Sequence, residues 1–146
     1  MNTTRRKWVG VAALAGAVGL AGGCAMMQSG SHTHRVTLSG ANEVPPVSTS
    51  ASGTGTVTVK TDRSVSARIT VSGMAATASH IHVAPAGANG PVIVPFVKQG
   101  DNTFVAAEGA KMTESQYEAY MAGRTYVNVH SAKNPDGEVR AQLSNR

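Results

Sequence analysis

The chain has 146 residues, a formal net charge of +5 and only 4% aromatic residues. This length suits one domain of ordinary size, with a core built mainly from Val, Ile and Ala. Three of the thirteen basic residues and none of the eight acidic ones lie within residues 1–23, so the remaining chain has a net charge of +2. That remainder has no basic run with interleaved aromatic residues, which argues against nucleic acid as a partner.

The N-terminal segment has the features of an export signal. Arg5, Arg6 and Lys7 form a positive n-region, and the uncharged run WVGVAALAGAVGLAG follows. The apolar run is shorter than the ~20 residues that a membrane-spanning helix needs. A transmembrane anchor is therefore less favoured than a cleaved signal, although an ordinary secretory peptide remains an alternative.

The signal segment ends at LAGGC, where small residues precede Cys24, the only cysteine in the chain. This pattern resembles a bacterial lipobox, in which the cysteine is acylated with diacylglycerol and becomes the first mature residue. A lipobox usually has Leu three residues before the cysteine, whereas here Ala21 takes that place and Leu20 lies one residue earlier. We expect residues 1–23 to be a lipoprotein signal peptide. The protein would be exported and held on a membrane through lipid on Cys24, in the periplasm or at the cell surface.

Residues 24–34 show no apolar period and are predicted to form a tether between the lipid and the domain. His32 and His34 form a His-x-His pair within it, close to a Met-Met pair that could supply soft ligands for copper(I). A flexible tether holds ligands in no fixed geometry, so only adventitious or donor-type metal binding is expected there. An interfacial role next to the lipid is an equal alternative.

Residues 35–146 are predicted to be the folded domain, and their dominant pattern is a period of two, typical of β-strands. The apolar alternation begins at Val36 and Leu38 and continues in the segments 53–60, 64–72, 80–84, 91–96, 102–108, 125–131 and 138–144. Short Gly- and Pro-rich links between neighbouring segments predict hairpins. One helix is expected over about 113–122, because Thr113 and Gln116 have capping-box spacing and Gly123 follows as a stop. The pattern predicts an all-β, antiparallel β-sandwich with one short helix.

Three histidines are the strongest candidate ligand set. Alternation places Ile81 and Val83 on one face of their strand and His80 and His82 on the other, and it turns His130 outward from its own strand. If the two strands are neighbours, the three imidazoles converge outside the core, where they would suit copper or zinc. The competing interpretation is that these histidines are solvent-side residues, or that they hydrogen-bond turns without binding metal.

The other charged side chains predict a structural role. Glu138 and Arg140 share the outward face of the last strand, and Glu43 lies in the rigid segment NEVPPV. An ion pair between Glu43 or Glu138 and Arg140 is expected to brace the strand ends. No catalytic residue is assigned, because a lone carboxylate without a nucleophile or a second acid explains no reaction.

Three longer motifs carry a family resemblance: LSGANEVPPVSTSASGTGTV, ASHIHVAPAGANGPVIVPF and GRTYVNVHSAKNPDGEVRAQL. Together they resemble the CHRD domain, first described in chordin and widespread in bacterial exported proteins, over nearly all of residues 35–144. The resemblance implies an immunoglobulin-like antiparallel β-sandwich in an extracytoplasmic protein. In chordin the domain belongs to a protein that binds signalling ligands outside the cell.

The segment HIHV also looks like the His-x-His strand of copper/zinc superoxide dismutases. This similarity implies that His80 and His82 are copper ligands, with His130 as a candidate third ligand and Arg140 as a candidate for steering anions. A dinuclear site needs more histidines and an aspartate, and the predicted domain has only three histidines. A mononuclear copper site is what the similarity can support, and fold analogy establishes neither activity.

The sequence therefore predicts a lipid-anchored, extracytoplasmic CHRD-domain binding protein, with copper held by His80, His82 and His130. The first alternative is a metal-free module that recognises a protein or a polysaccharide. A superoxide dismutase-like copper enzyme ranks third, and an enzyme is the less favoured class.

Overall fold

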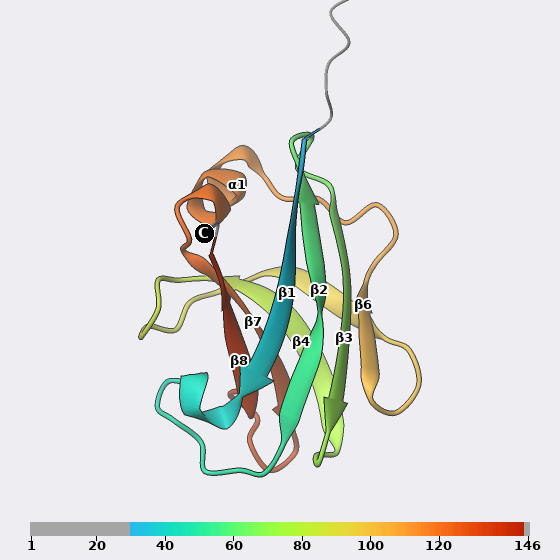
Figure 1. The fold of residues 1–146 in the computed structure, drawn as a ribbon, viewed down its shortest axis with the longest axis vertical. Helices are drawn as coiled ribbons and strands as arrows, with labels where there is room; N and C mark the ends of the chain where they lie inside the picture. The colour runs from blue at the N-terminus through green and yellow to red at the C-terminus, as the bar shows by residue number, and fades with distance from the viewer. Residues whose placement is uncertain (1–29, 145–146) are drawn as a thin grey trace, which may run out of the picture.

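A computed structural model describes residues 30–144, and within them the chain forms eight strands, one short 3-10 helix and one α-helix (Figure 1). The predicted signal peptide and Cys24 lie outside this range. The elements in chain order are β1 (Ser31–Ser39), η1 (Gly40–Asn42), β2 (Ser52–Lys60), β3 (Val65–Ser72), β4 (Ala76–Val83), β5 (Val92–Lys98), β6 (Thr103–Ala106), α1 (Glu114–Met121), β7 (Thr125–Ser131) and β8 (Val139–Leu143).

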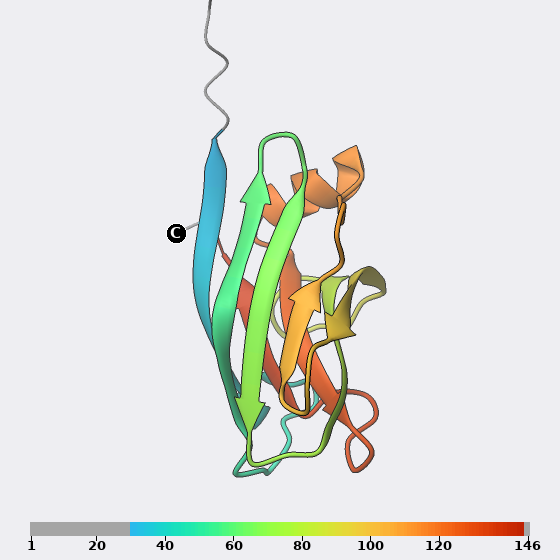
Figure 2. The ribbon, with the colours of Figure 1, turned by 90° about the vertical axis from the view of Figure 1, so that its right-hand side faces the viewer.

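The strands form a closed antiparallel barrel in the order β1-β2-β3-β6-β5-β4-β7-β8. Figure 2 shows β1, β2, β3 and β6 side by side along one wall. The barrel closes where Ser39 of β1 pairs with Arg140 of β8. The all-β, antiparallel architecture is as predicted, but the immunoglobulin-like sandwich is not, because the first and last strands join. Strand alternation is the same in a sandwich and a barrel, so it could not reveal this closure.

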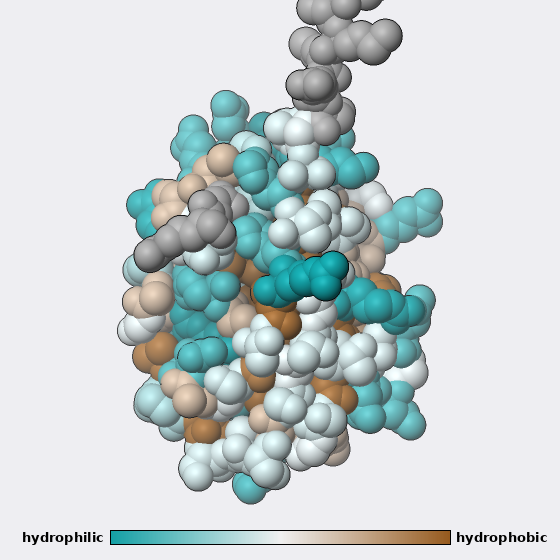
Figure 3. Space-filling view, viewed as in Figure 1, coloured by the Kyte–Doolittle hydropathy of each residue, from teal (hydrophilic) through white to brown (hydrophobic). Residues whose placement is uncertain are grey.

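The predicted hairpins are present. β2 pairs with β3 across the 61–63 link, β4 pairs with β5, and β7 pairs with β8. The inward faces of these strands form one apolar core, in which the side chains of Leu38, Val57, Ile69, Ile81 and Val127 are fully buried. The outward faces of β1 and β2 carry mainly threonine and serine. The face seen in Figure 3 is accordingly pale, with small, scattered apolar patches.

The helix α1 forms where it was predicted. Thr113 is its N-cap, and the reciprocal hydrogen bonds between Thr113 and Gln116 complete the capping box. Gly123 follows with φ of +69°, a left-handed conformation that favours glycine after a helix. In Figure 1, α1 lies at one end of the barrel, and the side chain of Tyr120 is fully buried. Within residues 30–144 no helix is both long enough and apolar enough to cross a membrane.

β1 begins earlier than the predicted domain boundary at residue 35. Residues 31–34 pair with the end of β2, and His32 and His34 lie on the same face of β1 as the buried Val36. Nε2 of His34 lies 2.5 Å from the hydroxyl oxygen of Tyr120. This histidine pair is therefore part of the barrel, packed against α1, and not part of a tether.

Candidate metal centre and its surroundings

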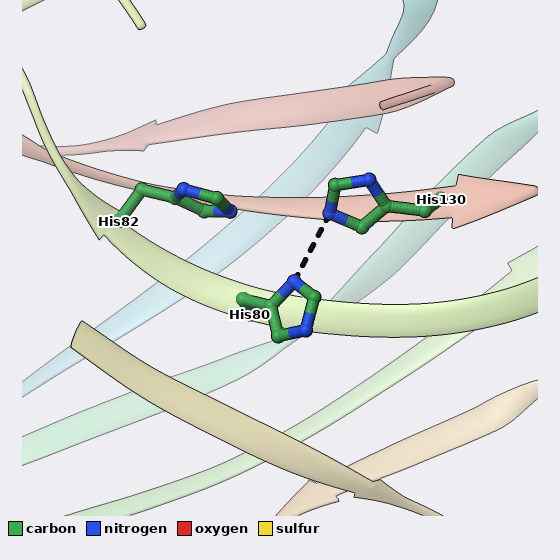
Figure 4. Close-up of side chains that lie close together, drawn as sticks. All are labelled: His80, His82 and His130. Atoms are coloured by element: carbon green, nitrogen blue, oxygen red, sulfur yellow. Dashed lines mark hydrogen bonds between the residues drawn. The ribbon is translucent and has the colours of Figure 1, made fainter. Parts of the chain in front are cut away.

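Three histidines meet on the outer face of two neighbouring strands. β4 pairs with β7 in a register that sets His80 opposite Asn128, His82 opposite Tyr126 and Ala78 opposite His130. One ring nitrogen from each of the three imidazoles lies within 4.8 Å of the other two. In Figure 4 these nitrogens face a shared space between the rings. Within residues 30–144 this is the one cluster of three or more His, Cys, Asp or Glu side chains with such geometry.

The tautomer of His82 follows from its hydrogen bond. Its Nδ1 lies 2.9 Å from the carbonyl oxygen of Gly90, and a carbonyl can only accept, so Nδ1 carries the proton and donates it. In the neutral ring, Nε2 is then an unprotonated acceptor. This Nε2 is buried, since the residue is only 8% exposed, and no group lies in hydrogen-bonding geometry with it, although the nearby side chain of Asn128 acts on the imidazole and opposes the lowering of its pKa. A buried acceptor without a partner costs free energy and needs an explanation.

The tautomers of His130 and His80 follow from their hydrogen bonds in the same way. Nδ1 of His130 donates to the carbonyl oxygen of Pro135 at 2.9 Å, which leaves its Nε2 unprotonated. That Nε2 accepts a hydrogen bond from Nδ1 of His80 at 3.0 Å, drawn as the dashed line in Figure 4. Backbone carbonyls therefore hold two of the three histidines with their Nε2 lone pairs turned toward the cluster. This is the second-shell arrangement that orients histidine ligands in metal sites.

Burial keeps His80 and His82 uncharged. Desolvation, followed by the neighbouring charges of His130 and His82, lowers the pKa of His80 to about 4. Desolvation also lowers the pKa of His82, and the hydrogen bond to Gly90 partly opposes this. Both rings are therefore neutral at physiological pH, the form that binds metal.

A β-bulge lies directly beside the cluster. The pairing of β4 with β5 shifts register between Ile81 and His82, so that Ile81 faces Val94 while His82 faces Val92. Bulges turn side chains and are common next to functional sites. The bulge lies at His82, close to the loop whose Gly90 carbonyl accepts a hydrogen bond from Nδ1 of this histidine.

That loop, residues 84–91 between β4 and β5, connects the histidine cluster to Arg140. The imidazole of His82 stacks on the ring of Tyr126, with centroids 4.8 Å apart and planes 5° from parallel. The guanidinium of Arg140 lies 3.4 Å from the centroid of the same ring. Arg140 also donates to Asn89 Oδ1 at 3.1 Å and to the carbonyl oxygen of Ala88 at 2.9 Å. Arg140 and His82 thus hold three consecutive residues of this loop, Ala88, Asn89 and Gly90.

The predicted ion pairs to Arg140 do not form. Neither Glu43 nor Glu138 lies within 4.0 Å of its guanidinium, and in the described range the one ion pair is between Arg63 and Glu114. Glu138, which lies just before β8, instead accepts hydrogen bonds from the hydroxyl groups of Thr49 and Ser131.

Glu43 is held near Arg140 without touching it. Its carboxyl group is buried, and desolvation raises its pKa to about 7, against the opposing influence of Arg140 and the side chain of Asn128. Its Oε1 has no hydrogen-bond partner. At neutral pH this carboxyl group is therefore divided between its protonated and ionised forms.

The outward, polar face of β7 and β8 is buried beneath loops and is not open to solvent. The exposed fraction is 2% for Tyr126, 2% for Asn128 and 1% for Arg140. Alternation gave the correct face for each side chain, but it could not show that the 84–91 loop and the segment after η1 fold over that face. Polar residues are often outside the apolar core and still buried when loops cover them.

Several participants were missed in the sequence. Asn89 and Gly90 were interpreted only as turn residues, although their dipeptide supplies the acceptors for Arg140 and His82. Gln142 hydrogen-bonds Arg140, and it could have been found by its position two residues further along the same face.

The fold and the site define an antiparallel β-barrel with a buried polar face and a cluster of three histidines. The CHRD domain family matches residues 34–143, and the chain belongs to this family. Comparisons with curated proteins and with solved structures gave no match.

Proposed function

We propose that this CHRD protein is exported, anchored to a membrane through lipid on Cys24, and binds one copper ion through His80, His82 and His130. The observation that carries the metal proposal is the buried, unpartnered Nε2 of His82, which faces the other two rings. A metal ion would supply the partner that this nitrogen lacks.

The ligand atoms follow from the hydrogen bonds. His82 and His130 would bind through Nε2, since their Nδ1 atoms donate to Gly90 and Pro135. His80 would bind through Nδ1 after its proton moves to Nε2, which gives up the hydrogen bond to His130. A neutral imidazole exchanges these tautomers readily.

The spacing requires a modest contraction. Metal–nitrogen bonds of about 2.0–2.1 Å in a tetrahedral site place the nitrogens about 3.3 Å apart, compared with the 4.8 Å limit in the cluster. Three neutral imidazoles suit Cu(II) and Zn(II), and copper binds more strongly at nitrogen sites of equal geometry. A fourth position would remain for water or another ligand.

Titration with Cu(II) tests this proposal. The purified protein should bind one equivalent, and His82→Ala should weaken the affinity by at least about tenfold. The matched control is His32→Ala, which removes a half-buried histidine of β1 outside the cluster and should leave the affinity unchanged. Equal affinity and stoichiometry in wild type and His82→Ala would reject the site. A parallel Zn(II) titration decides between the two metals.

The alternative function is a metal-free module that recognises a protein or a polysaccharide. The observation in its favour is that the hydrogen bonds from His82 to Gly90 and from His130 to Pro135 also brace two loops. Under this alternative, His82→Ala would lower the stability of the domain while the protein showed no stoichiometric copper binding. The dismutase-like enzyme would need redox turnover by the copper-loaded protein, and an assay of that protein tests it.

A further inference from the structure

A pocket of about 470 Å³ opens beside β8, separate from the histidine cluster. Its lining residues come mainly from η1, the segment after it, the 84–91 loop and β8, which lie on one side of the barrel in Figure 1. None of the three histidines lines it. Its polar floor consists of Glu43, Arg140 and Gln142, and its walls include the small apolar side chains of Ala41, Val44, Pro46 and Ala86.

Arg140 has unused hydrogen-bonding capacity in this pocket. A guanidinium has five N–H donors. Three are used: one of NH1 to Asn89, and two of NH2 to Ala88 and Gln142. Among residues 30–144, Nε–H and the second N–H of NH1 have no hydrogen-bond partner. These two N–H groups point in different directions, so each can donate to one oxygen of an anionic ligand.

The charge of Arg140 is only partly compensated. Among residues 30–144 no carboxylate lies within 4.0 Å of the guanidinium, although the nearby Glu43 acts on it electrostatically, and Arg140 is only 1% exposed. The ring of Tyr126 offsets part of the desolvation cost through a cation–π contact. A buried cation without a contacting anion is costly, so an anionic ligand would be favoured here.

The protonation of Glu43 also favours an anionic ligand in this pocket. Because its pKa is about 7, it is largely protonated below neutral pH and then offers an O–H donor in place of a negative charge. Arg140 of β8 and the side chain of Asn128 of β7 act on it from the barrel. Glu43 also borders a second pocket, which Lys133 and Asp136 line.

We propose that this pocket binds a small organic carboxylate, with one carboxylate oxygen on a free N–H donor of Arg140 and a short apolar body against Ala41, Val44 and Pro46. The size of the pocket falls in the range of small-molecule sites, and a few polar groups at its floor would fix the orientation of the ligand. The pocket and the histidine cluster share no lining residue, although Tyr126 and the 84–91 loop contact both Arg140 and His82.

Titration of the purified, isotope-labelled protein with propionate, followed by NMR, tests this site. Propionate should shift the backbone amides of Asn42 and Gly87 in a saturable way. Propionamide, the neutral isostere, and chloride should leave them in place. The proposal is overturned if propionate shifts these amides no more than propionamide does, or if its saturable shifts map elsewhere.

The choice of variant must separate a loss of propionate binding from a loss of folding. Arg140→Lys removes the planar guanidinium, but it can also unfold the protein because the residue is buried. Glu43→Gln preserves the shape and removes the competing negative charge. At about pH 8 it should bind propionate at least about threefold more tightly than wild type. Equal or weaker binding by this variant at that pH contradicts the proposed position of the ligand beside Arg140.

Discussion

Gly137 lies directly against the carboxyl group of Glu43: a Cβ atom at residue 137 would be 2.5 Å from Oε1 of Glu43 and 2.7 Å from Nδ2 of Asn128. Gly137 also has φ of +135°, a conformation that side-chain-bearing residues rarely adopt. The turn before β8, the segment after η1 and the polar face of β7 therefore meet at this one residue. Their close approach is what buries Glu43.

Gly137→Ala should destabilise the protein by about 2–3 kcal/mol, through backbone strain and through displacement of Glu43 and Asn128. The matched control is Gly87→Ala. Gly87 has φ of +79°, but nothing lies within 4 Å of its added Cβ, so the control should cost only about 1 kcal/mol. Urea unfolding of both variants measures the difference. Equal losses would show that the contact with Glu43 is not tight.

Glu43→Gln should stabilise the protein at about pH 8 by on the order of 1–3 kcal/mol and leave it unchanged at about pH 4. The pKa of Glu43 is raised from 4.5 to about 7, so the folded state holds this proton more tightly than the unfolded state. The stability from this group is complete below pH 4.5 and is lost as the pH rises through about 7.

The lowered pKa of His80 acts in the opposite direction, since stability from that group is lost as the pH falls from 6.5 through about 4. Because His80 is present in both proteins, its contribution cancels when the stability of wild type is subtracted from the stability of Glu43→Gln. Thermal unfolding of both proteins across this pH range gives the difference. A constant difference at all pH values would mean that Glu43 titrates normally.

Tyr120→Phe should destabilise the protein by about 1 kcal/mol, because the fully buried hydroxyl contacts Nε2 of His34. Tyr117→Phe, at a partly exposed position of the same helix, is the control and should change stability by less than about 0.5 kcal/mol. Chemical unfolding compares them. If the two variants unfold alike, the packing of β1 against α1 contributes little, and residues 31–34 behave as the tether that the sequence suggested.

The sequence predicted the local structure well because local structure depends on short patterns. The capping box of Thr113 and Gln116, the hairpins and the inward face of each strand all follow from residues close together in the chain. Alternation also gave the outward faces of His80, His82 and His130, but their convergence depended on the pairing of β4 with β7, which the sequence left as a condition. Barrel closure did not follow, because the pairing of Ser39 with Arg140 joins strands from opposite ends of the domain.

The surroundings of the site were harder to predict for the same reason. The expected ion pair of Arg140 was replaced by contacts with Tyr126 and with the 84–91 loop. A loop path over a strand face is set by tertiary packing and leaves no periodic signal in the sequence. The start of β1 was placed late because His32 and His34 are polar residues facing inward, which hides the apolar alternation.

Cys24→Ala should release the protein from membranes into the soluble exported fraction, if lipid on this cysteine is the anchor. Membrane fractionation followed by detection of the protein measures this. Cys24→Ser is a second variant that also removes the thiol and should behave in the same way. Unchanged membrane retention of both variants would contradict the lipid anchor.

Electron paramagnetic resonance of the protein loaded with one equivalent of Cu(II) tests the proposed copper site most directly, because the coupling to ligand nitrogens reports their number. The account predicts three imidazole nitrogens in wild type and in His32→Ala, and one fewer in His130→Ala. A wild-type spectrum without three imidazole nitrogens, or one that His130→Ala leaves unchanged, would contradict it.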